Sequence, residues 1–254
     1  MNFSYWELKN WFTEIDYTIV GSGIVGLNCA LALREKFPES KILILEKGIL
    51  PQGASTKNAG FACFGSISEI IDDLKSLSEE EVTQLISKRW NGLQLLRKNL
   101  GDETIDFKPY GGYELFLTED ESTYNECLQK LPFINELLKP LFRNDVFAKE
   151  VDRFSFKGIQ EYVVFNPFEA QIDTGKMMNA LLQKAITNNI LILNQVEVTT
   201  YLEKKDSVEV DLGDFSFSTK RLFTKSFLRS LEIDRKVSQL KIKIVSDQEI
   251  VRIY

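Results

Sequence analysis

Three glycines near the N-terminus have the spacing of a loop that holds a diphosphate. The pattern G-x-G-x-x-G is formed by Gly21, Ser22, Gly23, Ile24, Val25 and Gly26. In such loops a side chain at the first glycine would clash in the turn, the second glycine lets the main chain approach a phosphate, and the third lets a helix pack on a strand. Glu46 follows 20 residues after Gly26, where a carboxylate can accept hydrogen bonds from ribose hydroxyls. These residues predict a dinucleotide-binding site.

The elements around the glycines are those that must position such a site. The apolar run 17–20 predicts a buried parallel strand, and a helix with apolar periodicity runs from the glycines to about Lys36. A second buried strand over 42–45 ends at Glu46. The start of the helix presents free N–H groups and the positive end of its dipole, which favour a doubly charged phosphate. Because these parts occur in order, we interpret the segment as binding a dinucleotide rather than as a glycine-rich turn that binds nothing.

A second stretch of small and polar residues, 53–68, follows this unit. Small residues allow the main chain to approach a flat or anionic ligand, and hydroxyl groups can donate hydrogen bonds to phosphate. The alternative is a polar loop without a ligand. The residues that we expect to contact a cofactor here are Ala54, Ser55, Asn58, Ala59 and Gly60.

The segments GSGIVGLNCALAL…ILILEKG and GASTKNAGFA together resemble the D-amino-acid-oxidase-like family of FAD-dependent oxidoreductases, which includes glycine, sarcosine and D-amino acid oxidoreductases. The resemblance implies FAD as the cofactor, with its pyrophosphate at residues 21–26, its adenosine ribose at Glu46, and the 54–60 loop against pyrophosphate and flavin. Lys47 matches a basic residue common after the acid. The family's strand near 196–198 contacts adenine through its main chain, which assigns that role to Val198 here.

The resemblance also implies the architecture. We expect an α/β fold, with a Rossmann-like FAD-binding domain and an inserted α+β antiparallel-sheet substrate domain. The expected boundaries are 1–75 for the first part of the FAD-binding domain, 76–168 for the substrate (cap) domain, 169–222 for the second part of the FAD-binding domain and 223–254 for an atypical tail. Candidates to face the substrate cavity are Tyr110, Tyr113, Tyr162 and Phe165.

Local patterns predict the remaining elements. An N-terminal helix within 1–15 is expected to pack on its own domain, with a partner-binding helix as the alternative. Further predictions are helices within 69–100, over 121–139 and over 172–186 with Thr174 as its cap, a strand over 113–117, and a buried strand followed by a meander up to 222.

Composition excludes several classes of function. The chain of 254 residues has 44% hydrophobic residues, 27% charged residues and a net charge of −6, without a basic stripe, which argues against nucleic acid as a partner. The absence of histidine removes Ser–His and Cys–His nucleophile systems and most catalytic zinc sites, so we name no metal ligand. Three scattered cysteines, the lack of a secretory signal and the lack of a membrane span favour a cytoplasmic protein.

The C-terminal part departs from the family pattern. Residues 214–254 contain neither glycine nor proline. Thr224 and Phe227 could align with a turn that closes on FAD, but Lys225 and Ser226 occupy positions where a small residue and a glycine are expected. We therefore expect a chain truncated relative to the family, with an unusual but native C-terminus as the alternative.

The expected activity is oxidation of a small-molecule amine or amino acid by hydride transfer to flavin, without an assignable catalytic residue. Two alternatives remain open. One is a truncated, catalytically inactive remnant of such an enzyme. The other is a NAD-dependent dehydrogenase, which Glu46 alone would permit but which the 53–60 loop disfavours. The sequence does not identify the substrate, the electron acceptor or the oligomeric state.

Overall fold

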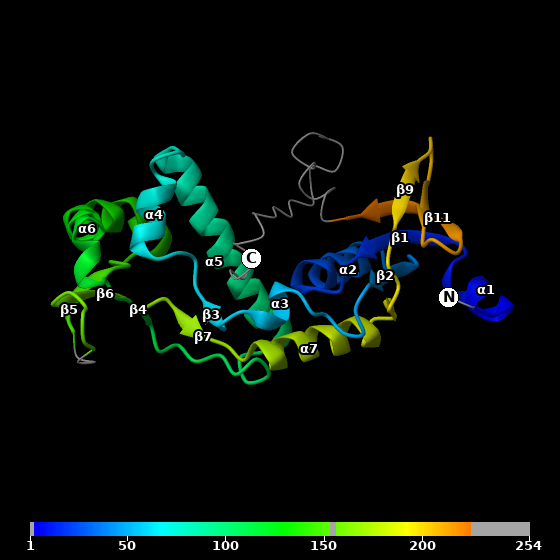
Figure 1. The fold of residues 1–254 in the computed structure, drawn as a ribbon, viewed down its shortest axis with the longest axis horizontal. Helices are drawn as coiled ribbons and strands as arrows, with labels where there is room; N and C mark the ends of the chain where they lie inside the picture. The colour runs from blue at the N-terminus through cyan, green and yellow to red at the C-terminus, as the bar shows by residue number, and fades with distance from the viewer. Residues whose placement is uncertain (1–2, 153–155, 225–254) are drawn as a thin grey trace. The chain divides into compact units, whose positions relative to one another are not determined.

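Figure 1 shows the computed structural model of the chain, in which residues 3–152 and 156–224 are described. These residues form two compact units, and the expected α/β class is confirmed. The first unit contains 3–58 and 174–224, and the second contains the described part of 59–173. The compact units therefore divide at 58/59 and 173/174, whereas the functional boundaries at 75/76 and 168/169 stay a prediction. Most of the predicted tail lies outside the described residues, as do Lys225, Ser226 and Phe227.

The first unit is built on a six-stranded sheet with the strand order β8-β2-β1-β11-β10-β9. Its strands are β1 (Ile15–Val20), β2 (Ile42–Glu46), β8 (Leu191–Asn194), β9 (Thr200–Glu203), β10 (Val208–Asp211) and β11 (Ser216–Phe223). The first four in spatial order are parallel, and β10 and β9 continue the sheet antiparallel. The two predicted parallel strands and the predicted meander are thus confirmed. Every residue of β2 is buried, as expected for a strand between two parallel neighbours.

Two helices of this unit pack against each other, α2 (Ile24–Lys36) and α7 (Thr174–Thr187). The Arg34 guanidinium on α2 donates hydrogen bonds to the carbonyls of Asn188 and Asn189, just beyond the C-terminus of α7, at 2.9 and 3.1 Å. Cations at this position satisfy the last carbonyls of a helix and complement its dipole. Thr174, which the sequence predicted as the cap of this helix, is its first helical residue.

The N-terminal helix α1 (Tyr5–Trp11) has no buried residue, and only Trp11 at its end packs against the apolar core of the first unit. Its N-cap, Ser4, forms a reciprocal capping box with Glu7. The following residue Phe12 is buried and its ring lies 4.9 Å from Phe215 and 5.1 Å from Phe217. The helix is thereby tied to β11 and the turn before it.

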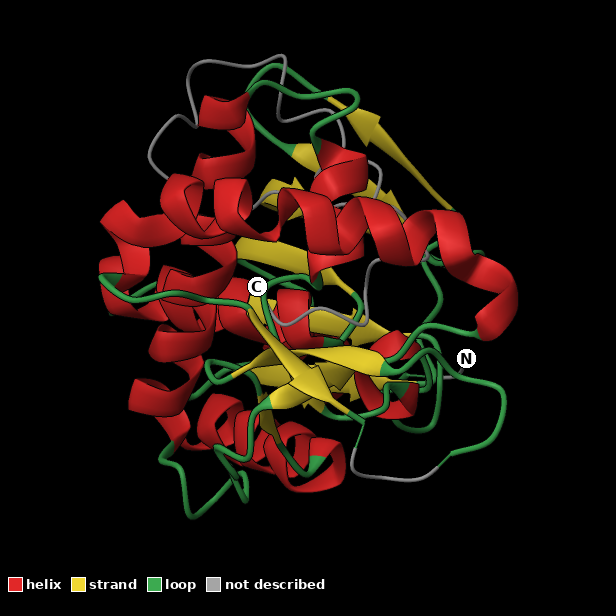
Figure 2. Cartoon of the chain, turned by 90° about the vertical axis from the view of Figure 1, so that its left-hand side faces the viewer, coloured by secondary structure: helices red, strands yellow, loops and turns green. Residues whose placement is uncertain are grey.

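The second unit combines helices with a three-stranded antiparallel sheet of order β4-β6-β5. Figure 2 distinguishes the helices of the whole chain, in red, from its strands, in yellow. The helices of the second unit are α4 (Ile67–Asp73), α5 (Glu79–Leu100), α6 (Glu121–Phe142) and the 3-10 turn η1 (Thr118–Asp120). Its strands are β4 (Gly112–Glu114), β5 (Ala148–Val151) and β6 (Tyr162–Asn166), with β3 (Phe61–Ala62) paired separately to β7 (Ala170–Gln171). The predicted helices are confirmed, and Gly101 ends α5 with φ +86°.

The strand predicted over 113–117 is shorter than expected. β4 ends at Glu114, because the chain then leaves β6 and makes an isolated bridge between Leu117 and Ile159. Thr118 N–H continues this detour by donating to the Gly158 carbonyl at 2.9 Å.

Within the described residues, no helix is both long enough and apolar enough to cross a bilayer.

Candidate cofactor-binding site

Gly21 is required for its backbone conformation rather than for space. β1 ends at Val20, and Gly21 follows with φ +98°, in the region that residues with a side chain rarely adopt. A Cβ atom at Gly21 would have no atom within 4 Å. The expected steric clash is therefore wrong, and the positive φ is the physical reason for glycine in this turn.

Gly26 makes the close packing that the motif predicts. A Cβ atom there would lie 2.0 Å from the Gly21 carbonyl oxygen and 3.3 Å from Cγ2 of Ile19. Gly23 is the N-cap of α2, and its Cβ would lie 3.0 Å from the Ser55 Oγ. The turn from β1 into α2 thus lacks side chains at its three glycine positions.

Ser55 closes on this helix start from the short helix α3 (Ala54–Lys57). Its buried hydroxyl accepts a hydrogen bond from the Ile24 N–H at 2.9 Å, and the hydroxyl proton can still be donated to an anion. In the described part of the chain, no hydrogen bond is recorded for the N–H groups of Val25 and Gly26. Together with the helix dipole, these donors suit a phosphate.

Replacing Ser55 by alanine is expected to lower the free energy of unfolding by about 1 kcal/mol, because the Ile24 N–H loses the acceptor that caps α2. Urea denaturation measures this change. The control is Thr56→Ala, whose hydroxyl bonds only to nearby carbonyls of its own turn, at Pro51 and Gly53. An equal loss in both variants would contradict a capping role for Ser55.

The Glu46 carboxylate is buried and already holds the glycine turn. Its Oε2 accepts from both the N–H and the hydroxyl of Ser22, each at 2.9 Å, and its Oε1 accepts from the Gly48 N–H at 2.9 Å. A carboxylate has about four acceptor positions, so one at Oε1 remains for a ribose hydroxyl. The two hydrogen bonds by which Ser22 positions the acid were not predicted from the sequence. The type of Ser22 and its place within the motif were the only available signal.

Four other residues that were predicted to contact the cofactor differ in their exposure and in the unit to which they belong. Lys47 is exposed directly after β2, and the Asn58 amide donates to the carbonyls of Ala54 and Ser55 at 3.2 and 3.0 Å, which closes α3. Ala59 and Gly60 belong to the second unit. There Gly60 has φ +80° and its carbonyl accepts from the Ile172 N–H at 2.8 Å.

The strand predicted around 196–198 is absent from the described structure. After β8 the chain leaves the parallel register, because Gln195 with φ +58° donates to the Gly48 carbonyl and Val196 donates to the Glu46 carbonyl, both at 2.9 Å. Val198 lies in the irregular connection that follows and is partly buried against the apolar core. No hydrogen bond of its main chain is recorded among the described residues, so its proposed contact with adenine stays a prediction.

The aromatic candidates of the second unit fall on different surfaces. Tyr113 and Phe165 are paired across β4 and β6, with ring centroids 4.7 Å apart. Tyr162 alternates to the opposite face of β6 and lies under the Lys149 ammonium, 3.6 Å from the ring centroid. Tyr110 is 70% exposed. A shared aromatic surface is therefore limited to Tyr113 and Phe165.

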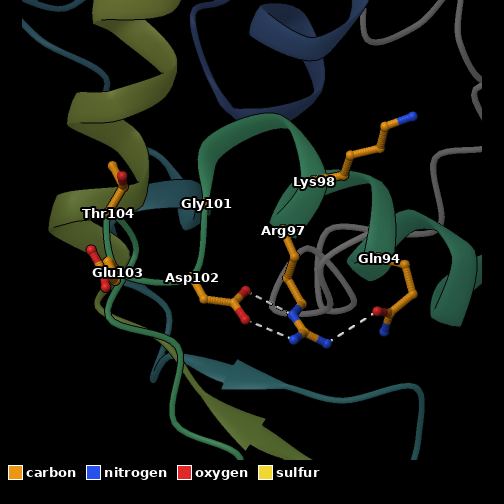
Figure 3. Close-up of a pocket in the computed structure, with 7 residues that line it drawn as sticks. All are labelled: Gln94, Arg97, Lys98, Gly101, Asp102, Glu103 and Thr104. Carbon is orange, nitrogen blue, oxygen red and sulfur yellow. Dashed lines mark hydrogen bonds and ion pairs between the residues drawn. The ribbon is translucent and has the colours of Figure 1, made fainter.

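A shallow pocket of about 570 Å³ lies at the C-terminal end of α5 (Figure 3). Its principal cation, Arg97, points to Asp102 and donates two hydrogen bonds to that carboxylate at 2.8 and 2.7 Å. A third guanidinium nitrogen donates to the Gln94 side chain at 3.0 Å. Because the Arg97 guanidinium is already paired with Asp102, it is not available to hold a separate anion.

The comparisons with known proteins agree with the fold and the motif. A family model described as FAD dependent oxidoreductase matches residues 16–220. A search of curated protein sequences finds no match. The matched range includes the glycine turn, Glu46 and the whole second unit.

Solved structures share the fold at low sequence identity. They include an L-amino acid deaminase from Proteus myxofaciens, with 16% identity, a TM-score of 0.62 and coverage of 84% of this chain and 45% of that one. Glycine oxidase from Geobacillus kaustophilus has 16% identity and a TM-score of 0.53 over 83% of this chain and 54% of that one. L-proline dehydrogenase from P. horikoshii has 15% identity and a TM-score of 0.55, with 91% and 57% covered. The present chain spans about half the length of these proteins.

Proposed function

Because the chain belongs to the family of FAD dependent oxidoreductases, we propose that it binds FAD through the β1–α2 turn and oxidises an amine or an amino acid. The observation that carries the proposal is the start of α2. There the three glycines of the turn, the Ser55 hydroxyl and the buried Glu46 surround one helix N-terminus. The proposed cofactor residues are those named from the sequence.

Each of these groups has a defined part in holding the cofactor. The N-terminus of α2 and the Ser55 hydroxyl would hold the diphosphate by hydrogen bonds and by the helix dipole. The free acceptor position of Glu46 would take a ribose hydroxyl, while Ser22 keeps the carboxylate in place. These contacts position the cofactor without taking part in the oxidation.

The reaction places few demands on side-chain chemistry. A bound flavin supplies the acceptor for a hydride from the carbon beside the substrate nitrogen. A neutral amine needs no side-chain base for this step, which is compatible with a chain that has no histidine. The protein then has to orient the substrate and exclude water. We assign no catalytic residue.

The substrate class is proposed from similar structures. They are named as acting on L-amino acids, glycine, L-proline and iminodiacetate, all of them compounds with an amine beside an oxidisable carbon. The tilted ring pair Tyr113 and Phe165 is our candidate for the apolar part of a substrate surface. An amine-dependent reduction of bound flavin under anaerobic conditions tests the substrate class separately from cofactor binding.

FAD binding is expected for the purified protein and is expected to be lost in Gly23→Val. The added side chain would meet Ser55 and cover the start of α2. We expect the free energy of FAD binding to weaken by about 3 kcal/mol, which corresponds to a roughly hundredfold rise in the Kd. Quenching of FAD fluorescence on titration measures the Kd, with NAD⁺ competition to test the dehydrogenase alternative.

The control is Gly213→Ala, in the hairpin between β10 and β11, which adds a side chain at φ +87° without touching the glycine turn. It should bind FAD as the parent protein does. Absence of FAD binding in the parent protein would overturn the proposal. Binding without any reduction by amines would instead support the alternative of a protein that holds flavin and catalyses nothing.

A further inference from the structure

The second unit contains a small polar cavity with two carboxyl groups. The cavity has a volume of about 130 Å³. Its walls are formed by Ser66, Gly112, Tyr113, Glu114, Phe147, Val164, Asn166 and Glu169. Glu114 lies at the end of β4, and Glu169 lies in the turn between β6 and β7. No basic side chain is among the described residues of this wall.

The two carboxyl groups have different surroundings. Glu114 accepts hydrogen bonds from the Ser66 hydroxyl at 3.1 Å, from the Ser68 N–H at 3.3 Å and from the Ser68 hydroxyl. Glu169 accepts one long hydrogen bond, 3.3 Å, from the Asn166 side-chain amide. Three donors stabilise negative charge on Glu114, whereas a single distant donor does little for Glu169.

The Glu169 side chain is also packed closely against the main chain of Gly112. A Cβ atom on Gly112 would lie only 1.9 Å from Glu169 Oε2 and 3.0 Å from its Cβ, so the carboxyl group fills the space that a side chain would take. Burial, and to a lesser degree the negative charge of Glu114, raise the pKa of Glu169 to about 7. The cavity therefore accommodates the neutral form of this side chain.

The turn that carries Glu169 is connected to the pairing of β3 with β7. The Glu169 carbonyl accepts from the Gly111 N–H at 3.1 Å. Two residues later, Gln171 and Lys108 exchange hydrogen bonds at 2.8 and 2.9 Å. Ile172 then donates to Gly60, directly before β3. Movement of the turn would thus loosen residues 60–62.

We propose that Glu169 is a proton-operated latch: its neutral carboxyl group seats the 166–169 turn against β4, and its ionisation releases the turn and the β3–β7 pairing. The charge that opposes ionisation from β4 is Glu114, with Tyr113 as the other titratable wall residue. On α4 the nearest charge behind Ser66 is Glu69, which accepts from the Ser66 N–H and belongs to its capping box. The wall residues from β6 are Val164 and Asn166, and neither carries a charge.

The sign of the effect follows from proton linkage. The folded unit binds the proton more tightly than the unfolded chain, because the pKa of Glu169 is raised from 4.5 to about 7. The stabilisation is fully present below pH 4.5 and is lost as the pH rises through 7. Between pH 6 and pH 8, protection of the latch against opening should fall about tenfold.

Amide hydrogen exchange tests the latch without FAD, so that failure of the cofactor proposal does not affect the outcome. Protection factors of Gly111, Gln171 and Ile172, corrected for the intrinsic pH dependence of exchange, should fall about tenfold from pH 6 to pH 8. In Glu169→Gln, which keeps the shape and cannot ionise, they should stay constant. Glu161→Gln, an exposed change in the same unit, should keep the parent response.

A second measurement covers the possibility that Glu169→Gln folds poorly. The carboxyl carbon of Glu169, followed by NMR in the parent protein, should titrate with a midpoint near 7. A midpoint at the ordinary value of glutamate, or a pH response that persists in Glu169→Gln, overturns the latch. A midpoint near 7 with a response that vanishes in Glu169→Gln establishes it.

Discussion

Gly26→Ala is expected to be the most damaging single change in the first unit. The new methyl carbon would lie 2.0 Å from the Gly21 carbonyl oxygen, which is main chain and cannot rotate away. α2 would have to move off β1, where Ile19 Cγ2 is a further close neighbour at 3.3 Å. Overpacking of this kind costs about 3 kcal/mol or more. Both the free energy of unfolding and the affinity for FAD should fall, as measured by urea denaturation and by flavin fluorescence.

Gly21→Ala is the matched control, because the same atom is added in the same turn. There the new methyl group meets nothing within 4 Å, and the cost is confined to the backbone at φ +98°, about 1–2 kcal/mol. The free energy of unfolding should therefore be much lower for Gly26→Ala than for Gly21→Ala, and both should lie below the parent protein. Equal stability of the two variants would contradict the close crossing of α2 over β1.

The sequence predicted this unit well because its signals are local. The glycine spacing, the apolar runs and the acid after the second strand lie within 16–46, and β1, α2 and β2 form where these signals occur. The strand expected near 196–198 was assigned from the family resemblance. In this chain, hydrogen bonds from Gln195 and Val196 to the carbonyls of Gly48 and Glu46 take the backbone out of the sheet.

Polar partnerships between distant residues could not be predicted in the same way. Ser22 and Glu46 meet only because β1 and β2 are neighbours, so the carboxylate that was assigned to a ribose is also bound to the glycine turn. The role of Gly112 is another example, because its lack of a side chain makes room for Glu169, which is distant in the sequence. Periodicity identifies which face of a helix is apolar, but it does not reveal a charged residue buried on that face.

Arg89 is such a residue, and Arg89→Met is expected to give the largest loss of stability in the second unit. The side chain lies on α5 and is 1% exposed, among the apolar residues that the helix buries. Its Nη1 donates to the Phe64 carbonyl at 3.1 Å and lies 3.8 Å from the Asp73 Oδ2. Arg89 thereby connects three segments: α5, the end of α4 and the chain after β3.

Methionine would fill much of the volume but would leave the Phe64 carbonyl without this donor and Asp73 without its nearby cation. Burial already raises the pKa of Asp73, and the charge of Arg89 opposes that shift. Removing one partner of a fully buried ion pair costs about 3–5 kcal/mol. We expect the free energy of unfolding to fall by about 2–3 kcal/mol here, because the Asp73 side chain is 27% exposed and water can partly replace the guanidinium.

Arg97→Met provides the control on the same helix. Arg97 pairs with Asp102 at the surface, with 29% and 45% of the two side chains exposed, and such pairs contribute about 1 kcal/mol or less. Urea denaturation should therefore separate the two variants, and hydrogen exchange should place the loss in α4 and α5. A loss in Arg89→Met no larger than in Arg97→Met would mean that the buried guanidinium contributes packing alone. A clear excess would identify its charge as the link that holds the segment after β3 to the helices.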